Sequence, residues 1–277
     1  MDFKRIQIVL VFFFLVFDIY LLFMLFNRAE VASLPTEEIE LTIEENLSNR
    51  GVTFDELSTE KYQLPFVVSE TNNHLAENIS QLEIEDVSVN QDGMLTGTLS
   101  EPMDLGLGLT AETTGFSTEQ RQALQDILEN PTLFISGDVY RNVWYVNSEQ
   151  VIYARMTAYD GSPIVDGTAE IRINLDDNYM MTGYTQTFQS NITELDRDRT
   201  ILSEREALEI IDRRVETLIP DDSTIHYSIL VYYRQTQLDG LNVYSPAWQI
   251  VYDNPNGRFT LLVDGIRGNT VNRNQFN

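Results

Sequence analysis

The sequence predicts an α+β protein in which a single N-terminal transmembrane helix is followed by an extracellular ectodomain of repeated helix-plus-antiparallel-sheet units. One long apolar run, over residues 6–26, predicts the transmembrane helix. In the rest of the chain, segments of helical periodicity are followed by segments in which apolar and polar residues alternate. Hydrophobic residues make up 43% of the chain and aromatic residues 10%, which indicates packed cores rather than disorder.

The apolar run has the length of a membrane span. As a helix rising about 1.5 Å per residue it would extend roughly 31 Å, which matches the roughly 30 Å hydrocarbon core of a bilayer. Lys4 and Arg5 precede the run and a long acidic chain follows Arg28, so the positive-inside bias places the N-terminus in the cytoplasm and the C-terminal domain outside the cell. A cleaved signal peptide is the alternative, although its apolar core would be shorter and residues 31–33 form a weak cleavage site.

One acid, Asp18, lies near the middle of this run. A charged side chain at mid-bilayer costs about 2.5–3.5 kcal/mol on insertion scales, and intramembrane acids usually face a partner or a water-filled cavity. A single span has no internal partner, so we expect the helix face of Asp18 to contact another transmembrane helix. The alternative is a protonated, unpaired and merely tolerated carboxyl group. The residues that share the face of Asp18 on a helix are Phe14, Leu21, Leu22 and Leu25.

Beyond the anchor region of residues 1–28, the chain is expected to form three segments. Residues 29–110 hold an N-terminal helix and a hairpin, and residues 111–195 and 196–277 are each one helix-plus-sheet unit. The hairpin is predicted by two alternating runs that flank the turn dipeptide Asp92-Gly93. Further alternating runs predict strands at residues 150–158, 163–175, 179–189, 224–235, 247–253 and 258–265.

Local signals place the helices. Apolar residues recur every fourth position over residues 36–51, which end at a glycine suited to a left-handed cap. The two later helices are expected over residues 117–130 and 203–220. Each begins with a capping box, in which a serine and an acid or amide three residues later satisfy the free amides of the first turn. The two pairs are Ser117 with Gln120 and Ser203 with Glu206.

The net charge is −25. A surface this acidic repels nucleic acid and anionic lipid. It also disfavours anionic wall polymers unless cations bridge the two. The chain has no cysteine, which excludes a disulfide framework and a thiol nucleophile.

Motifs for catalysis, cofactors or metals are missing from the sequence. The two histidines, His74 and His226, have no metal-ligand spacing, and there is no Gly-x-Ser-x-Gly elbow. The glycines of residues 104–110 lack the Gly-Lys-Ser/Thr of a phosphate loop. We therefore expect no enzyme, no cofactor and no metal site. Several aromatic residues fit either a carbohydrate-binding platform or, more commonly at strand spacing, core packing: Tyr140, Trp144, Tyr145, Tyr232, Tyr233, Tyr244 and Trp248.

The chain resembles the YycI (WalI) family. Its first 23 residues have the short Met-Asp-aromatic start, the basic residues and the aspartate-bearing span of that family. Three further matches are the helix end at residues 47–52, the run Gln63-Leu64-Pro65 and the closing Val263-Asp264-Gly265.

This resemblance implies an accessory regulator of an essential two-component system, YycFG (WalRK), in the cell membrane of Gram-positive bacteria. Family members modulate a sensor histidine kinase through its transmembrane helices, together with a sister protein, YycH, and contribute to cell-wall homeostasis. The family offers no catalytic residue to carry over. An extracellular module that binds cell-wall fragments or peptides remains the alternative, and its mark would be an aromatic-lined groove between the two sheet units.

Overall fold

The computed structural model describes residues 13–18, 41–195, 197–213 and 218–271. The chain forms two compact units, residues 1–42 and 43–277. In the first unit, residues 13–18 are helical. Among the described residues, no helix is long and apolar enough to cross a membrane. Most of the expected span, residues 6–12 and 19–26, lies outside the described residues.

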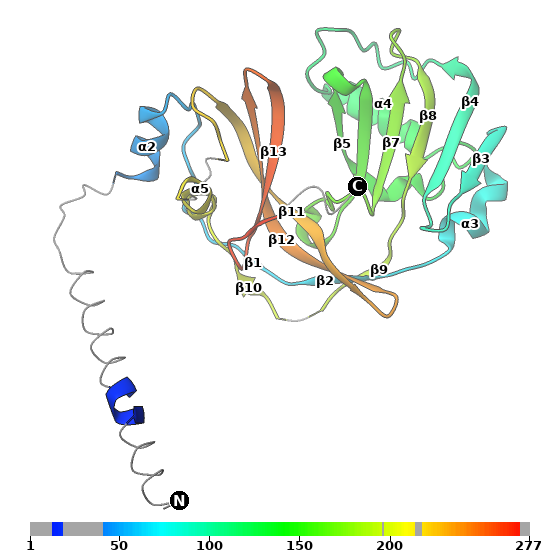
Figure 1. The fold of residues 1–277 in the computed structure, drawn as a ribbon. Coiled ribbons are helices and arrows are strands. Elements are labelled where there is room, and N and C mark those ends of the chain that lie inside the picture. The colour runs from blue at the N-terminus through cyan, green and yellow to red at the C-terminus, as the bar shows by residue number, and fades with distance from the viewer. Residues whose placement is uncertain (1–12, 19–40, 196, 214–217, 272–277) are drawn as a thin grey trace, which may run out of the picture. The chain divides into compact units, whose positions relative to one another are not determined.

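The first six-stranded sheet of the second unit is antiparallel throughout (Figure 1). Helix α4 (Thr118–Leu128) covers one of its faces, where Leu124 and Leu128 pack with Ile152 and Ile171 in one buried core. Because successive side chains of a strand point to opposite faces, the other face carries the remaining residues of each strand. In spatial order the strands are β3 (Asp86–Val89), β4 (Leu95–Met103), β8 (Met181–Gln186), β7 (Glu170–Leu175), β6 (Val151–Met156) and β5 (Tyr140–Val146).

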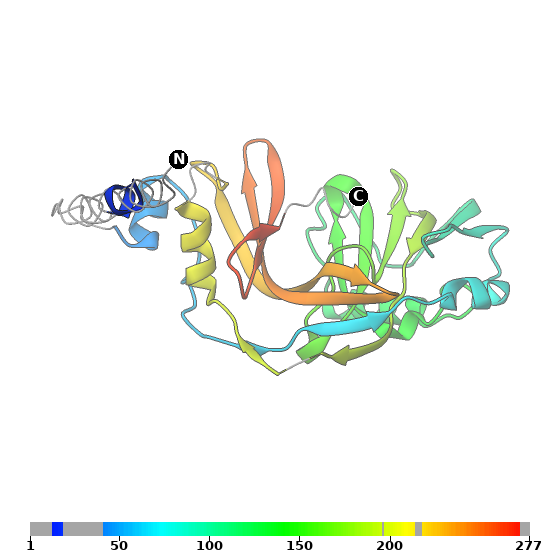
Figure 2. The same ribbon diagram turned by 60° about the horizontal axis from the view of Figure 1, so that its bottom comes forward.

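A second antiparallel sheet is built around the long strand β12 (Leu241–Asn254). β11 (Thr224–Leu238) pairs with it along one side. On the other side, residues 247–254 pair with β13 and residues 241–244 with β2, and Figure 2 shows β2 running beside β12. The remaining strands are β2 (Val67–Glu70), β9 (Ser190–Glu194), β13 (Gly257–Asp264) and β14 (Thr270–Val271).

Two helices cover one face of this second sheet. In α5 (Glu204–Asp212), Leu208 and Ile211 are buried against Trp248 and Ile250 of β12. α2 (Ile43–Asn49) contributes Ile43 and Leu47 to the same core. The smaller elements are β1 (Gln63–Leu64) paired with β10 (Arg199–Thr200), α3 (His74–Asn78), and the 3-10 turns η1 (Ile79–Gln81), η2 (Gly137–Val139), η3 (Asn147–Glu149) and η4 (Tyr159–Gly161).

The segment after η4 fastens the two sheets to each other. Ile164 forms a parallel bridge with Tyr232 of β11. The amide of Val165 donates to the carbonyl of Tyr232 (2.9 Å), and the amide of Tyr232 donates to the carbonyl of Pro163 (2.8 Å). The buried carboxylate of Asp166 accepts the amide of Arg234. These bonds fix both sheets in one compact unit.

The predicted α+β class with antiparallel sheets is confirmed. Both capping boxes form as predicted, with Ser117 and Ser203 as the N-caps of α4 and α5. The helix expected over residues 203–220 ends at Asp212, and residues 218–220 are not helical. Pro220 disfavours helical backbone at the preceding Ile219.

The predicted hairpin of residues 82–101 is present as β3 and β4, and the turn at residues 254–257 joins β12 to β13. The first sheet joins β3 and β4 to β5–β8, and the second joins β2 to β11–β14. Strands from different predicted segments thus share a sheet, and the boundaries at residues 110 and 195 stay predictions.

We expect Gly137→Ala to destabilise the second unit by about 1–3 kcal/mol, the usual cost of forcing extra volume into a packed site. Gly137 is buried, and a Cβ built on it would overlap the backbone carbonyl of Leu128 at the end of α4. The measurement is the free energy of unfolding in urea. Gly115→Ala is the matched control, because a Cβ there has nothing within 4 Å. Equal effects of the two changes would contradict the close approach of η2 to α4.

Candidate functional site

The helix face predicted to contact a partner helix, here called the partner-helix stripe, consists of Phe14, Asp18, Leu21, Leu22 and Leu25. The structure describes only part of it. Phe14 and Asp18 lie on one helical turn, four residues apart, and both side chains are exposed; residues at this spacing share a helix face. The other residues of this helix face, Leu21, Leu22 and Leu25, lie outside the described residues. So do Lys4 and Arg5, the basic residues that predict the orientation in the membrane. The stripe as a whole therefore stays a prediction.

Most of the aromatic residues considered for a carbohydrate platform are core residues. Tyr232 and Tyr244 are fully buried, and burial raises the pKa of the Tyr244 phenol to about 12. Trp144 is half-buried and stacks on Tyr153, with ring centroids 5.2 Å apart. The other buried members are Tyr140, Tyr145, Tyr233 and Trp248. The set does not form one exposed platform.

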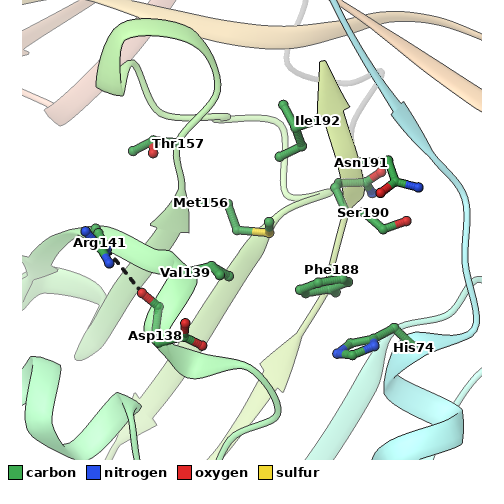
Figure 3. A pocket seen from close by; sticks show the side chains of 11 residues that line it. His74, Asp138, Val139, Arg141, Met156, Thr157, Phe188, Ser190, Asn191 and Ile192 are labelled. Carbon is green, nitrogen blue, oxygen red and sulfur yellow. Dashed lines mark hydrogen bonds between the residues drawn. The ribbon is translucent and has the colours of Figure 1, made fainter.

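A first surface cavity, of about 620 Å³, lies where α3, η2 and the start of β9 meet (Figure 3). The ring of His74 stacks on Phe188 at a centroid distance of 4.4 Å. Asp138 and Arg141 lie at the opposite side in Figure 3, where the Arg141 side chain donates to the carbonyl of Asp138 (3.2 Å).

Beside this cavity, the side chains of His74 and Ser136 lie within hydrogen-bond distance of each other. His74 Nε2 lies 2.8 Å from Ser136 Oγ. The Asn78 amide nitrogen donates to the carbonyl of His74 (2.8 Å) and also faces His74 Nδ1 at 3.4 Å. Either ring nitrogen can carry the proton, so the His74–Ser136 hydrogen bond has no assigned donor. The pair links α3 to the residue that precedes η2.

The second cavity, of about 460 Å³, is a cleft between the two six-stranded sheets. One wall is the face of β6, β7 and β8 that α4 does not cover, and the other wall comes from β12, β13 and β14. Most of its lining residues carry polar or charged side chains. They include Glu149, Tyr153, Arg155, Asp166, Glu170, Arg172, Thr185, Thr187, Gln249 and Thr260.

Arg155 and its contacts form the buried base of this cleft. The Arg155 side chain is 6% exposed and forms an ion pair with Glu170 on the neighbouring strand. Its guanidinium lies 3.6 Å from the centre of the Trp144 ring, a cation–π geometry. Tyr153 donates to Glu149 (2.7 Å), and burial followed by this hydrogen bond raises the pKa of the Tyr153 phenol to about 12.

A groove between the sheet units was expected as the mark of a binding module, but the residues that line this cleft were not predicted, although their signal was present. In the strand runs 150–158 and 163–175, Tyr153 and Arg155 are two positions apart, as are Glu170 and Arg172, so each pair lies on one face of its strand. Charged residues at alternate positions in otherwise apolar strands indicate a face that is not core.

A cluster of charged residues lies near the N-terminal end of β11. His226 is exposed on this strand, with Nε2 2.6 Å from Asp253. Arg258 donates to both oxygens of Asp253, at 2.8 and 3.0 Å. The Arg258 hydrogen bonds, supported by His226, lower the pKa of the Asp253 carboxyl to about 2. Across the described ranges, no group of three or more His, Cys, Asp or Glu residues is arranged to hold a metal ion.

Comparison with known proteins gives one family match. The family model of the YycI protein matches residues 34–265. No curated protein matches the chain.

Two solved structures match the chain at low similarity. An uncharacterized protein from Eubacterium rectale ATCC 33656 is 10% identical, with a TM-score of 0.44, and the match covers 80% of this chain and 89% of that one. The Bacillus megaterium YpeB C-terminal domain is 9% identical, with a TM-score of 0.34, and the match covers 73% of this chain and 96% of that one. Neither likeness is close enough to carry a conclusion about function.

The Asp253 cluster predicts a pH-dependent contribution to stability. The pKa of the Asp253 carboxyl in the folded protein, about 2, lies below the ordinary value of about 3.9. The stabilisation of the folded state by the ionised carboxylate is therefore complete above about pH 4 and disappears as the pH falls through about 2. We expect Asp253→Asn to lower the free energy of unfolding more at pH 6 than at pH 2.5. Asp92→Asn, a change in an exposed turn, is the control. A loss for Asp253→Asn that is constant with pH would contradict this assignment.

Proposed function

The chain belongs to the YycI family of membrane-associated regulators of the YycFG two-component system, and we propose that it regulates by contact rather than by catalysis. Its N-terminal helix, residues 6–26, spans the membrane once and docks against a transmembrane helix of the sensor histidine kinase. The C-terminal domain lies outside the cell and pairs with a YycH-like sister protein. Through these contacts the protein adjusts signalling for cell-wall homeostasis.

The observation that carries this proposal is Asp18 within an apolar run of membrane length. The described residues 13–18 are helical, and Phe13, Phe14, Val16 and Phe17 are exposed. Large apolar side chains that are exposed on a helix need an apolar environment. A carboxylate on the same helix needs a polar partner in that environment. A neighbouring transmembrane helix meets both needs.

The charge of the second unit supports a binding role. Its acidic surface can distinguish partners by charge complementarity. Contact therefore remains the function that this unit supports best.

A second candidate function is an extracellular module that binds cell-wall fragments or peptides. The cleft between the sheets favours it, because Tyr153 lines a cavity of ligand size and stacks with Trp144. Regulation by contact and ligand binding are compatible in one protein.

We expect Asp18→Leu to weaken association with the kinase while membrane insertion and ectodomain folding persist. The change replaces the polar contact by an apolar one and also removes the insertion cost of the carboxylate. An in-membrane two-hybrid assay measures the association. Val16→Leu is the control, because a residue two positions away lies on the other side of a helix. Undiminished association of Asp18→Leu would refute the proposed contact.

Replacing residues 1–30 with an unrelated single-span anchor is expected to abolish regulation of the kinase. The foreign anchor retains the membrane tether and the ectodomain but removes the partner-helix stripe. Transcription from promoters under control of the two-component system is the readout. Normal regulation by the exchanged protein would show that the ectodomain alone carries the function.

A further inference from the structure

The cleft between the two sheets has walls of different character. The strand register places Tyr153, Arg172 and Thr185 in one row across β6, β7 and β8. Leu262 and Val271 give the facing wall an apolar part, beside Gln249 and Thr260. The volume of about 460 Å³ lies within the range of about 300–1,000 Å³ that is usual for small-ligand sites. A small ligand with charged groups on an apolar body fits these walls.

Two of the three carboxylates that line the cleft already have ionic or hydrogen-bond partners within the protein. Glu170 forms the ion pair with Arg155. Asp166 accepts the amides of Arg234 and Thr168 and the Thr168 hydroxyl. These groups shape the site and are not available as the main anchors of a ligand charge.

Arg172 and Glu149 are the two charged groups that remain. Both are exposed, and both lie beside the ring of Tyr153. The Arg172 guanidinium is 5.9 Å from the ring centre, and Glu149 accepts the Tyr153 hydroxyl at 2.7 Å. Within the described part of the chain, neither forms an ion pair. One aromatic ring is thus flanked by a cation and an anion that both face solvent.

We propose that this cleft binds a short peptide that carries both a free carboxylate and a free ammonium group. Arg172 binds the carboxylate, because guanidinium matches a carboxylate in charge and geometry. Glu149 binds the ammonium group. The Tyr153 ring and the apolar part of the opposite wall contact the body of the peptide. This ligand site is independent of the proposed partner-helix stripe in the N-terminal helix.

The charge pattern favours this ligand class over two others. A neutral saccharide would use neither Arg172 nor Glu149 as an ionic anchor. A polyanion would meet Glu149, Asp166 and Glu170 in the cleft and a chain of net charge −25 around it. A ligand with one charge of each sign pairs with both free groups.

The test is calorimetric titration of the full-length protein in detergent with tri-alanine that has free termini. We expect saturable binding by the native protein. Tri-alanine that is acetylated and amidated lacks both charges and is expected not to bind. We expect Arg172→Gln and Glu149→Gln each to weaken binding of the free peptide by about tenfold or more, since each removes one charge-assisted contact.

Arg141→Gln is the matched control, because Arg141 is also exposed but lines the other cavity; it is expected to bind the peptide like the native protein. Thermal unfolding of all three variants verifies that they are folded. No binding of tri-alanine at 10 mM would overturn the proposal, as would equal affinity of Arg172→Gln and native protein. Binding of N-acetylglucosamine in place of the peptide would overturn the ligand class.

Discussion

The hydrogen bonds between residues 163–168 and strand β11 are the constraint on which the rest of the second unit depends. Tyr232 exchanges backbone bonds with Pro163 and Val165, and its hydroxyl donates to the carbonyl of Pro65 (3.0 Å). One residue thereby connects β11 with the segment between η4 and β7 and with the segment that leads into β2. Tyr232 is fully buried, so breaking these bonds would leave unsatisfied polar groups in the core, at a cost of about 1–3 kcal/mol each.

The same region holds a buried polar network that links the two sheets. Gln189 accepts from Ser69 (2.6 Å) and from Asn242 (2.9 Å), which belong to β2 and β12 of the second sheet. It also donates to the carbonyl of Thr168 (2.8 Å), just before β7 of the first sheet. All three side chains are buried. Buried polar groups favour one arrangement because only that arrangement satisfies all of them. The network therefore favours one arrangement of the two walls of the cleft, and preorganisation of this kind lowers the cost of binding a ligand.

Local signals in the sequence predicted local structure well. The capping boxes of Ser117 and Ser203 formed because a serine and the side chain three residues later need only each other and the first turn. The pairing of β2 with β12 and β9 was not predictable in the same way. It joins Val67 to Tyr244 and to Glu194, and no pattern within a short window reports a partner so far along the chain.

The cleft illustrates the same limit. Alternation shows that Tyr153 and Arg155 share a face of β6, but it does not show which face α4 covers or that β12 and β13 lie opposite. The partner-helix stripe was predicted from residue chemistry alone, and only Phe14 and Asp18 of it are described. The sequence thus predicted the residues of the stripe, whereas the tertiary structure was needed to identify the cleft residues and bring them together.

In the proposed transmembrane contact, the free energy that the Asp18 carboxylate would contribute is of the size that regulation requires. An unpartnered carboxylate at mid-bilayer costs about 2.5–3.5 kcal/mol. A partner helix that relieves this cost equally in every kinase conformation increases association but shifts no equilibrium between conformations. A helix that relieves it in only one conformation shifts that equilibrium by up to the same free energy, and coupling energies of about 1–3 kcal/mol are typical of allosteric proteins. In the proposed contact, Asp18 alone would therefore be sufficient for regulation, provided that the two kinase states present it with different neighbours.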